Sequence, residues 1–503
     1  MAIDVKTKSD AQVSYHEDPS SNVLEKGDSI SDNSDFQDDP ERAKRILRAV
    51  DIRLVPVLTL LYLISFLDRS NIGNARVAGL DTDLGLNDKQ YNMALTIFFF
   101  PYALFEVPSN IVLKLLTPRK WLTTITLTWG TVLTLMGIVQ GYRGLLAARF
   151  FLGVAEAGFF PAATYILTTF YPKYELQKRL AVFYSSAALA GAFSGLLAFA
   201  LQKMDGIGGL AGWRWIFIME GIVTVVIGAL IPFILIDSPA TQKFLSPDDT
   251  KFYLRRLEHD NKTGSKDQDQ FKWKYVTSAL LDWKIYLSTL IFWGNSVVIY
   301  SFVFTLPTAI KDMGYTREQA QLLTIPIYTF SCLTILVVAY YADKAARRFE
   351  FICYPFILCA VCFIALIAVP KTHSPGIRYG LLFGVAAGFY APLCGIVAWN
   401  ANNLAGSWKR SVGMALQITI GNLGGLVGSN IYMKAEAPYY WTGYGVSLAV
   451  LTIAIICSVV MLFALKRINK KREAMSEEEV RAKYTDEQLT ELGDKSPLFR
   501  YTL

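Results

Sequence analysis

The sequence predicts an all-α integral membrane protein in which twelve transmembrane helices form two pseudo-symmetric six-helix bundles. Three observations predict this fold class. The chain of 503 residues is 53% hydrophobic and only 18% charged, a balance far from that of ordinary soluble domains. Its apolar runs are long enough to cross a membrane, and motifs of the first half recur in the second half.

Each of the twelve apolar runs approaches the roughly 20 residues that a helix needs to cross a hydrocarbon layer about 30 Å thick. They lie near 54–77, 91–113, 121–140, 144–169, 180–202 and 214–236, and then near 285–309, 319–341, 349–370, 376–400, 411–433 and 441–465. The sequence therefore divides into a disordered tail (1–49), an N-terminal bundle (50–236), a central loop (237–283), a C-terminal bundle (284–466) and a second tail (467–503).

An even number of spans places both termini on one side of the membrane, and basic residues indicate which side. Lysines and arginines cluster before the first span and after the last: Arg42, Lys44, Arg45, Arg48, Arg53, Lys466, Arg467, Lys470, Lys471 and Arg472. Such residues gather on the cytosolic side, so both tails are predicted to be cytosolic. Because the bases lie at the edges of apolar segments, the net charge of +7 indicates lipid anchoring and no nucleic-acid partner.

An internal repeat supports the division into two halves. Gly153-Val154-Ala155 and Pro161, in the fourth span, recur 231 residues later as Gly384-Val385-Ala386 and Pro392. Parallel repeats of this kind are typical of transporters that rock about a central site. Small residues such as these glycines let helices pack closely, which both halves need.

Two charges of the fourth span are not repeated. At the same offset Arg149 falls on Gly380, and Glu156 falls on Ala387. Seven residues are two helical turns, so Arg149 and Glu156 share one face about 10 Å apart and can line one cavity. The membrane interior disfavours an ionised carboxylate, which suits a reversible proton carrier. The alternative is an ion pair that only fixes helix positions.

The first span carries a second pair of charges, Asp68 and Arg69. Arg69 and Arg149 are predicted to reach the same depth, where two guanidinium groups would bind a carboxylate. Asp68 is a second candidate for proton coupling, although it could instead pair locally with Arg69 or contact a helix end. The three histidines lie outside the spans, so proton coupling must use a carboxylate.

Other polar residues in the spans are weaker candidates. Glu106 in the second span is assigned to gating or structure, and Glu220 in the sixth likewise. Asn295, Tyr300, Gln417 and Asn422 are candidates to orient a ligand, although a polar residue in a membrane helix often bonds a neighbouring helix instead. All six cysteines lie in apolar runs, and no metal-ligand spacing, nucleophile motif or nucleotide loop is present. We therefore expect no metal, no cofactor and no enzyme activity.

Four motifs carry a resemblance to a known family: LDRSNIGNA (67–75), YALFEVPSN (102–110), RFFLGVAEAGFFP (149–161) and GWRWIFIMEG (212–221). The chain resembles permeases of the major facilitator superfamily, in particular the anion:cation symporter family and its fungal allantoate permease branch, with the greatest likeness to nicotinate permeases. The resemblance implies proton-coupled import of a small organic anion by alternating access. It assigns the substrate anion to Arg69 and Arg149, and the proton to Glu156.

The resemblance also implies a plasma-membrane location, and we expect a monomer. The superfamily's loop motif is kept in the second half at Asp343, Lys344, Arg347 and Arg348. In the first half Asn110 and Lys114 replace its glycine and aspartate, which leaves Arg119 and Lys120. An exporter of a metabolite or drug on the same fold is the main alternative, and a nutrient sensor that does not transport is a second.

Overall fold

The computed structural model describes residues 39–242, 244–262, 273–345, 347–369, 375–437 and 439–503. The helices of the N-terminal half are α2 (Pro40–Val77), α3 (Leu80–Asp83), α4 (Asp88–Thr96), α5 (Phe99–Leu115), α6 (Pro118–Met136), α7 (Tyr142–Glu156), α8 (Phe159–Phe170), α9 (Lys173–Leu201) and α10 (Gly212–Ile234). Those that follow are α11 (Pro247–Lys262), α12 (Trp273–Leu280), α13 (Trp283–Asp312), α14 (Arg317–Leu322), α15 (Thr324–Ala345), α16 (Phe349–Ala368), α17 (Pro375–Tyr390), α18 (Leu393–Asn402), α19 (Ser407–Asn422), α20 (Gly424–Gly428), α21 (Trp441–Glu473), α22 (Glu477–Lys483) and α23 (Asp486–Leu492).

Within the described ranges, ten helical segments are long and apolar enough to cross a membrane. The predicted second and third spans correspond to α4 with α5 and to α6. The threonines of α6 lower its hydropathy, but their hydroxyls donate to carbonyls one turn earlier, as Thr124 does to Lys120 and Thr128 to Thr124. Hydroxyls satisfied in this way are compatible with a helix in lipid.

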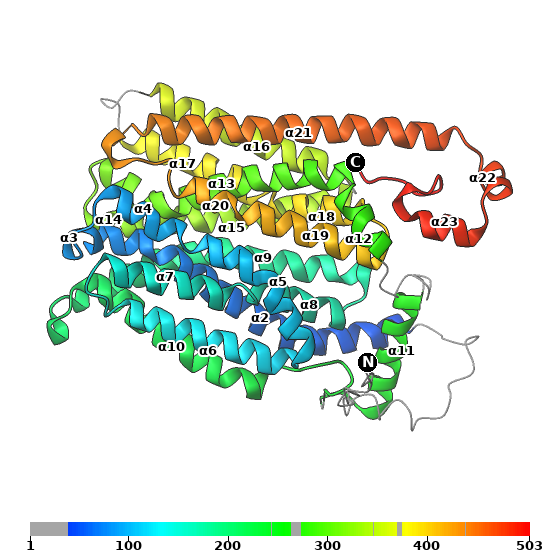
Figure 1. Cartoon of the computed structure of the whole chain (residues 1–503), viewed down its shortest axis with the longest axis horizontal. Helices are drawn as coiled ribbons and strands as arrows, with labels where there is room; N and C mark the ends of the chain where they lie inside the picture. Colours follow the sequence, from blue (N-terminus) through cyan, green and yellow to red (C-terminus); the bar gives the residue numbers. More distant parts are fainter. Residues whose placement is uncertain (1–38, 243, 263–272, 346, 370–374, 438) are drawn as a thin grey trace, which may run out of the picture.

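The long helices run side by side along one direction and form two groups (Figure 1). In the N-terminal half α6 packs on α10 and α2 on α9; in the C-terminal half α13 packs on α21 and α19. The halves meet where α2 contacts α13 and α9 contacts α15. The first turns of α2 and the helices α22 and α23 lie at the same end of the molecule, which we call the terminal end; the other end is the far end.

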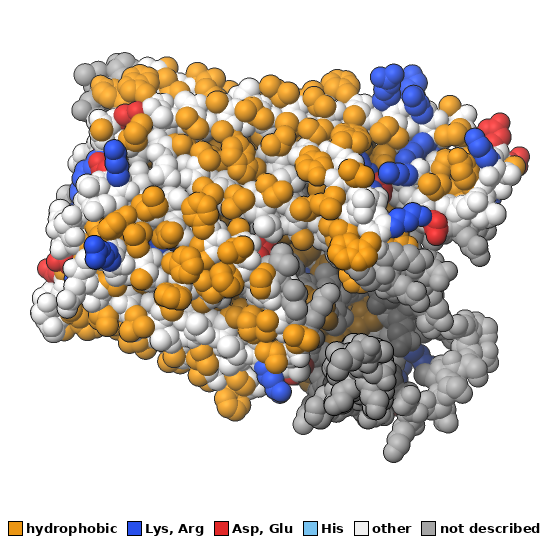
Figure 2. Space-filling view, viewed as in Figure 1, with side chains coloured by type: hydrophobic (Ala, Val, Ile, Leu, Met, Phe, Trp, Pro, Cys, Tyr) orange, Lys and Arg blue, Asp and Glu red, His pale blue; other side chains and the backbone are white. Residues whose placement is uncertain are grey.

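The surface is rich in exposed apolar side chains. Figure 2 shows them over the body of the molecule, with most Lys and Arg side chains toward its two ends. Phe233 is 85% exposed and Leu104 is 72% exposed, which would be unfavourable in water. Lipid removes that cost, so the surface fits a multi-pass membrane protein.

The repeat is visible in the backbone. The fourth span is broken between α7 and α8, and the tenth between α17 and α18, within about one turn of the same repeat position. A Cβ on Gly153 would lie 2.3 Å from the Phe98 carbonyl oxygen, and one on Gly384 would lie 2.4 Å from Cys362 Sγ. Both glycines therefore allow the close packing that the repeat predicted.

The predicted boundaries differ from the helices in three places. The first helix begins at Pro40 because the Asp39 side chain accepts hydrogen bonds from the Glu41 and Arg42 amides. This N-cap was not predicted. Residues 40–49 are therefore helical; residues 1–38 lie outside the described residues. The central loop contains α11 and α12, and the second tail contains α22 and α23.

Candidate functional site

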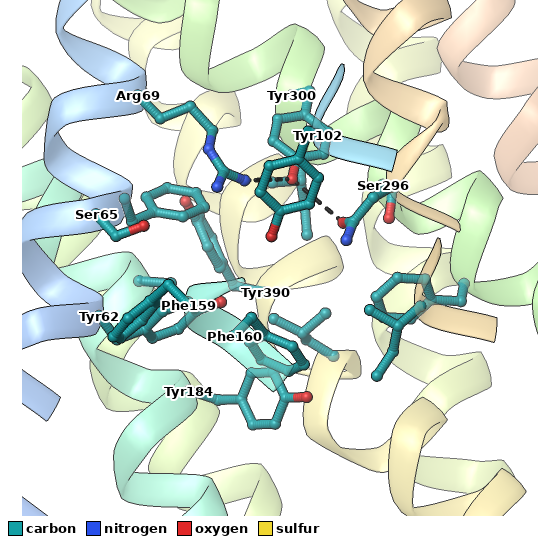
Figure 3. A pocket seen from close by; sticks show the side chains of 17 residues that line it. Tyr62, Ser65, Arg69, Tyr102, Phe159, Phe160, Tyr184, Ser296, Tyr300 and Tyr390 are labelled. Atoms are coloured by element: carbon teal, nitrogen blue, oxygen red, sulfur yellow. Dashed lines mark hydrogen bonds between the residues drawn. The ribbon is translucent and has the colours of Figure 1, made fainter. Parts of the chain in front are cut away.

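A cavity lies between the two halves and is lined by residues of both (Figure 3). We call it the central cavity. Its lining is polar on one side, where Arg69 lies beside Tyr102 and Tyr300, and aromatic on the other. The N-terminal half contributes Tyr62, Ser65, Phe66, Arg69, Tyr102, Phe159, Phe160, Tyr184 and Ala187, and the C-terminal half contributes Phe292, Ser296, Ile299, Tyr300, Tyr390, Leu393, Ile418 and Asn422. The sequence predicted Arg69, Tyr300 and Asn422 among these residues.

Arg69 forms a buried ion pair with Glu156. The distance from Arg69 Nη2 to Glu156 Oε2 is 2.8 Å, and Arg69 Nε donates to the same oxygen at 3.3 Å. Glu156 is fully buried at the break between α7 and α8, and its other oxygen has no hydrogen-bond partner among the described residues. α2 therefore places a guanidinium directly against this carboxylate.

The same guanidinium connects the two halves. Arg69 Nη1 donates to the Tyr300 hydroxyl at 3.0 Å, and that hydroxyl donates to Asn422 Oδ1 at 3.3 Å. The Arg69 guanidinium also stacks on the rings of Phe98 (4.9 Å) and Tyr102 (4.7 Å). These contacts hold the guanidinium at the cavity wall, where it can accept an anionic ligand.

Asp68 points away from the cavity into the N-terminal bundle. Its Oδ2 accepts hydrogen bonds from Trp129 Nε1 (3.0 Å) and Thr224 Oγ1 (3.1 Å), and the residue is fully buried. It interacts electrostatically with Glu156 and with Glu220, which lies one turn before Thr224 on α10. Asp68 is thus not the local partner of Arg69, and Glu220 belongs to its surroundings.

Three residues predicted to bind substrate do not line this cavity. Arg149 is buried near Tyr91 of α4, and its Nε and Nη2 have no partner among the described residues. Gln417 instead donates to Ser288 Oγ at 2.7 Å and accepts from Asn400 Nδ2 at 2.9 Å, so it bonds neighbouring helices. Asn295 is fully buried, and its amide has no described partner.

The predicted gating residues lie between or beside the bundles. The Glu106 side chain on α5 forms a hydrogen bond with Thr419 of α19, which connects the two halves. Arg119 binds Asp237, which follows α10, through its backbone N–H at 2.9 Å and its side chain at 3.4 Å. A carboxylate therefore lies beside Arg119 although the first-half loop motif lacks its aspartate. Lys120 is exposed, and the Lys114 side chain lies outside the described residues.

The second-half loop motif forms a local charge cluster at the terminal end. Arg348 Nη1 lies 2.8 Å from Asp343 Oδ1, and the more exposed Arg347 lies 3.5 Å from Glu350. Lys344 is exposed. Asp343 and Arg348 both line a second cavity of about 190 Å³ at the terminal end, between the two halves.

The cavities show which end of the molecule is open. The terminal-end cavity (about 190 Å³) and the central cavity (about 60 Å³) share Tyr184, whereas the space at the far end around Arg76 and Tyr91 is about 10 Å³. The halves touch at the far end through Thr96 Oγ1, which lies 2.9 Å from Ser429 Oγ and accepts from Asn430 Nδ2 at 2.8 Å. The structure is therefore open toward the terminal end and closed at the far end.

The aromatic wall of the central cavity was not predicted. Tyr62 stacks on Phe183 with ring centroids 4.4 Å apart, Phe159 lies 6.2 Å from Tyr62, and Phe160 lies 5.7 Å from Tyr184. Such residues are common throughout the chain, with 31 phenylalanines and 26 tyrosines. No sequence signal separates those that face the cavity from those that face lipid.

Comparisons with known proteins agree with this architecture. The model of the Major Facilitator Superfamily matches residues 58–429. The chain belongs to this superfamily. It is 37% identical to the MFS-type transporter cnsO of Penicillium expansum, over 92% of this chain and 90% of that protein, and 30% identical to the high-affinity nicotinic acid transporter of Saccharomyces cerevisiae, over 91% and 84%.

A solved structure shows the same fold. It is the crystal structure of a bacterial homolog of the human lysosomal transporter Spinster, in an inward-facing and unoccupied conformation. The TM-score is 0.65 at 14% sequence identity, and the match covers 85% of this chain and 98% of that one. The major facilitator fold is therefore confirmed, and so is a multi-pass membrane protein related to transporters of small molecules.

Proposed function

We propose that this protein is a proton-coupled importer of a small organic anion, specifically an aromatic monocarboxylate such as nicotinate, of the anion:cation symporter type. The observation that carries the proposal is the position of Arg69. Its guanidinium lies at the wall of the central cavity, and its charge is balanced by Glu156. A substrate carboxylate can therefore pair with Arg69 only when it takes the place of the Glu156 carboxylate.

The exchange couples proton and substrate. When Glu156 is ionised, it competes with a substrate carboxylate for the same guanidinium. When Glu156 takes up a proton, Arg69 loses its internal anion, and a substrate carboxylate can form the bidentate pair. Because the membrane interior disfavours an unbalanced charge, the carrier rearranges most readily when Arg69 has one anionic partner.

The cavity's aromatic wall favours a flat, apolar body on the substrate. Tyr62, Phe159, Phe160 and Tyr184 lie opposite Arg69 in Figure 3. Aromatic rings pack favourably at centroid distances of about 4.5 to 7 Å, so a planar ring attached to the carboxylate can pack here. The yeast relative, a high-affinity nicotinic acid transporter, agrees with this substrate class.

We also propose an orientation and a location for the carrier. Basic residues in the first turns of α2 and the last turns of α21 favour a cytosolic terminal end. We assign the protein to the plasma membrane and expect it to act as a monomer. Arg149 is assigned to the outward-open state, because its buried Nε and Nη2 find no partner among the described residues in the present conformation. Asp68 is assigned as the second acid of the proton relay.

Uptake measurements test the proposal. Radiolabelled aromatic acids, aliphatic monocarboxylates and the corresponding neutral amides are supplied at acidic and neutral external pH to a fungal strain that lacks the carrier. We expect uptake of aromatic acids, faster at acidic pH, and no uptake of the amides. Export of preloaded acid without uptake would favour the exporter, and binding without movement in either direction would favour a sensor.

A further inference from the structure

The last residues of the chain, 493–503, lie against the terminal end of the C-terminal bundle (Figure 1). Asn403, which follows α18, donates Nδ2 to the Thr502 carbonyl (3.1 Å) and accepts the Thr502 N–H on Oδ1 (2.8 Å). Asn469 on α21 forms the same two bonds with Tyr501, at 2.8 and 2.9 Å. Two side-chain amides thus satisfy the backbone of an extended segment, much as a neighbouring strand would.

The segment is also fixed by a buried charge cluster around Asp494. The Asp494 carboxylate binds Lys284 Nζ at the start of α13 and, at 2.8 Å, Lys409 Nζ on α19. Lys409 also binds Asp282 at 2.6 Å, and all four side chains are at most 5% exposed. Two cations and two anions balance, so the cluster carries no net charge only while Asp494 is in place.

Further contacts surround Asp494. Arg472 on α21 donates Nη2 to the Asp494 carbonyl (2.8 Å) and Nη1 to the Phe499 carbonyl (2.7 Å). The Tyr501 hydroxyl accepts from Lys284 Nζ at 3.0 Å and donates to the Asp494 carbonyl at 2.8 Å. Burial alone would raise the pKa of Asp494, but Lys284 and Lys409 outweigh it and hold this pKa below its ordinary value. Asp494 is therefore a buried, ionised anchor.

The end of the segment contacts the α15–α16 loop, which lines the terminal-end cavity. The Leu503 carbonyl accepts the Arg348 N–H at 2.7 Å where α16 begins, and the Thr502 carbonyl accepts from Trp399 Nε1 at 2.9 Å. Arg348 pairs with Asp343, and both residues line the cavity between the halves. Leu503 thus contacts a residue, Arg348, that itself lines the terminal-end cavity.

We propose that residues 493–503 are an intramolecular latch, which holds the ends of α13, α18, α19 and α21 together and fixes the α15–α16 loop beside the terminal-end cavity. All of its contacts described above lie in the C-terminal half, so the latch moves with that bundle as the halves rock. It acts on the α15–α16 loop by fixing the backbone of Arg348. This inference goes beyond the proposed function and does not depend on the substrate.

A two-residue truncation tests the latch without disturbing the charge cluster. Deleting Thr502 and Leu503 removes the bonds to Asn403, Trp399 and Arg348 but leaves Asp494 between its lysines. Thr502→Ala is the matched control, because the described hydrogen bonds of Thr502 use only its backbone. Hydrogen exchange in residues 347–352, at the start of α16, reports how firmly the segment holds the α15–α16 loop, because the Arg348 N–H donates to the Leu503 carbonyl.

The truncation should speed hydrogen exchange in residues 347–352 by about twofold or more, because it removes the bond that holds the start of α16. Thr502→Ala should leave this exchange unchanged. Asp494→Asn should speed the exchange as the truncation does, and Glu491→Gln, which alters an exposed pair with Lys274, should not. Unchanged exchange in the truncated protein would overturn the latch, whatever the carrier transports.

Discussion

Replacing Glu156 by glutamine tests how the central site works. The substitution keeps the size of the side chain and removes its charge, so Arg69 loses its only described ion-pair partner. In the wild-type protein a substrate carboxylate must displace Glu156 before it can bind Arg69. In the variant no displacement is needed, and we expect the anion to bind more tightly at neutral pH.

The magnitude follows from the bonds that are exchanged. Glu156 makes two charge-assisted contacts with Arg69, at 2.8 and 3.3 Å, both through one oxygen. A hydrogen bond to a charged group contributes about 1.5 to 3 kcal/mol. Removing this competitor should therefore lower the Kd for the anion about 10- to 150-fold at neutral pH. At acidic pH, where Glu156 is protonated in the wild-type protein, the two proteins should converge.

Ligand binding to purified protein, followed by thermal shift or scintillation proximity at acidic and neutral pH, measures this effect. Uptake into vesicles driven by a pH gradient measures the effect on transport. Vesicles with Glu156→Gln should exchange the anion but not accumulate it. Glu220→Gln is the matched control, a buried acid of the same half that has no described contact with Arg69. The reasoning is refuted if Glu156→Gln keeps pH-dependent binding and Glu220→Gln or Asp68→Asn loses it, which would place coupling on the Asp68 and Glu220 pair.

Three further predictions concern other contacts. Tyr300→Phe leaves an Arg69 N–H unpaired, at a cost of about 1 to 3 kcal/mol, and should weaken anion binding about tenfold in the same assay; Tyr390→Phe, which removes a hydroxyl with no described partner, should not. Gly153→Ala places a Cβ 2.3 Å from the Phe98 carbonyl oxygen. It should lower the free energy of unfolding by about 1 to 3 kcal/mol and with it the melting temperature. Gly380→Ala, whose Cβ meets open space, should leave the melting temperature unchanged. Ion pairs with Lys284 and Lys409 lower the pKa of Asp494 below its ordinary value of 3.8. The contribution of Asp494 to holding residues 493–503 is therefore complete at neutral pH and is lost only when the pH falls below 3.8. Hydrogen exchange in 493–503 should rise only in strongly acidic solution.

The fold was largely predictable because lipid imposes simple rules on a sequence. Apolar runs of about 20 residues mark the spans, and the repeated Gly153 and Gly384 mark equivalent breaks in the fourth and tenth spans. The ends of the segments were less predictable. The Asp39 cap and the docked C-terminus depend on single hydrogen bonds and on contacts between residues far apart in the chain, which periodicity does not register.

The site was predictable only in part, for a related reason. Arg69 and Glu156 were identified because charges in a membrane span are costly and need a function. The rotation of each helix decides which of them meet, and spacing within one helix does not give it. Arg149 and Glu156 share a face of one span, yet Glu156 pairs with Arg69 of another span, and Arg149 lies toward Tyr91.

The placement of charge suggests how protonation reaches the moving parts. Arg69, Glu156 and Asp68 all belong to the N-terminal half, whereas the C-terminal half meets them at the cavity with neutral groups, Tyr300 and Asn422. At the level of the cavity, the described hydrogen bond that crosses from Arg69 to the other half is the one to Tyr300. The charge state of Glu156 can therefore bias the two halves through that bond.

If so, the effects of Glu156→Gln and Tyr300→Phe on anion binding should not add. Loss of Glu156 frees Arg69 to reorient, and the Tyr300 hydroxyl then matters less for holding it. A double-mutant cycle should show a coupling of about 0.5 to 3 kcal/mol, the range for residues that share a partner. Gln417→Leu paired with Glu156→Gln supplies the control, because Gln417 bonds only within the C-terminal half. Additive effects in the first cycle would mean that the two halves respond to protonation through some other contact.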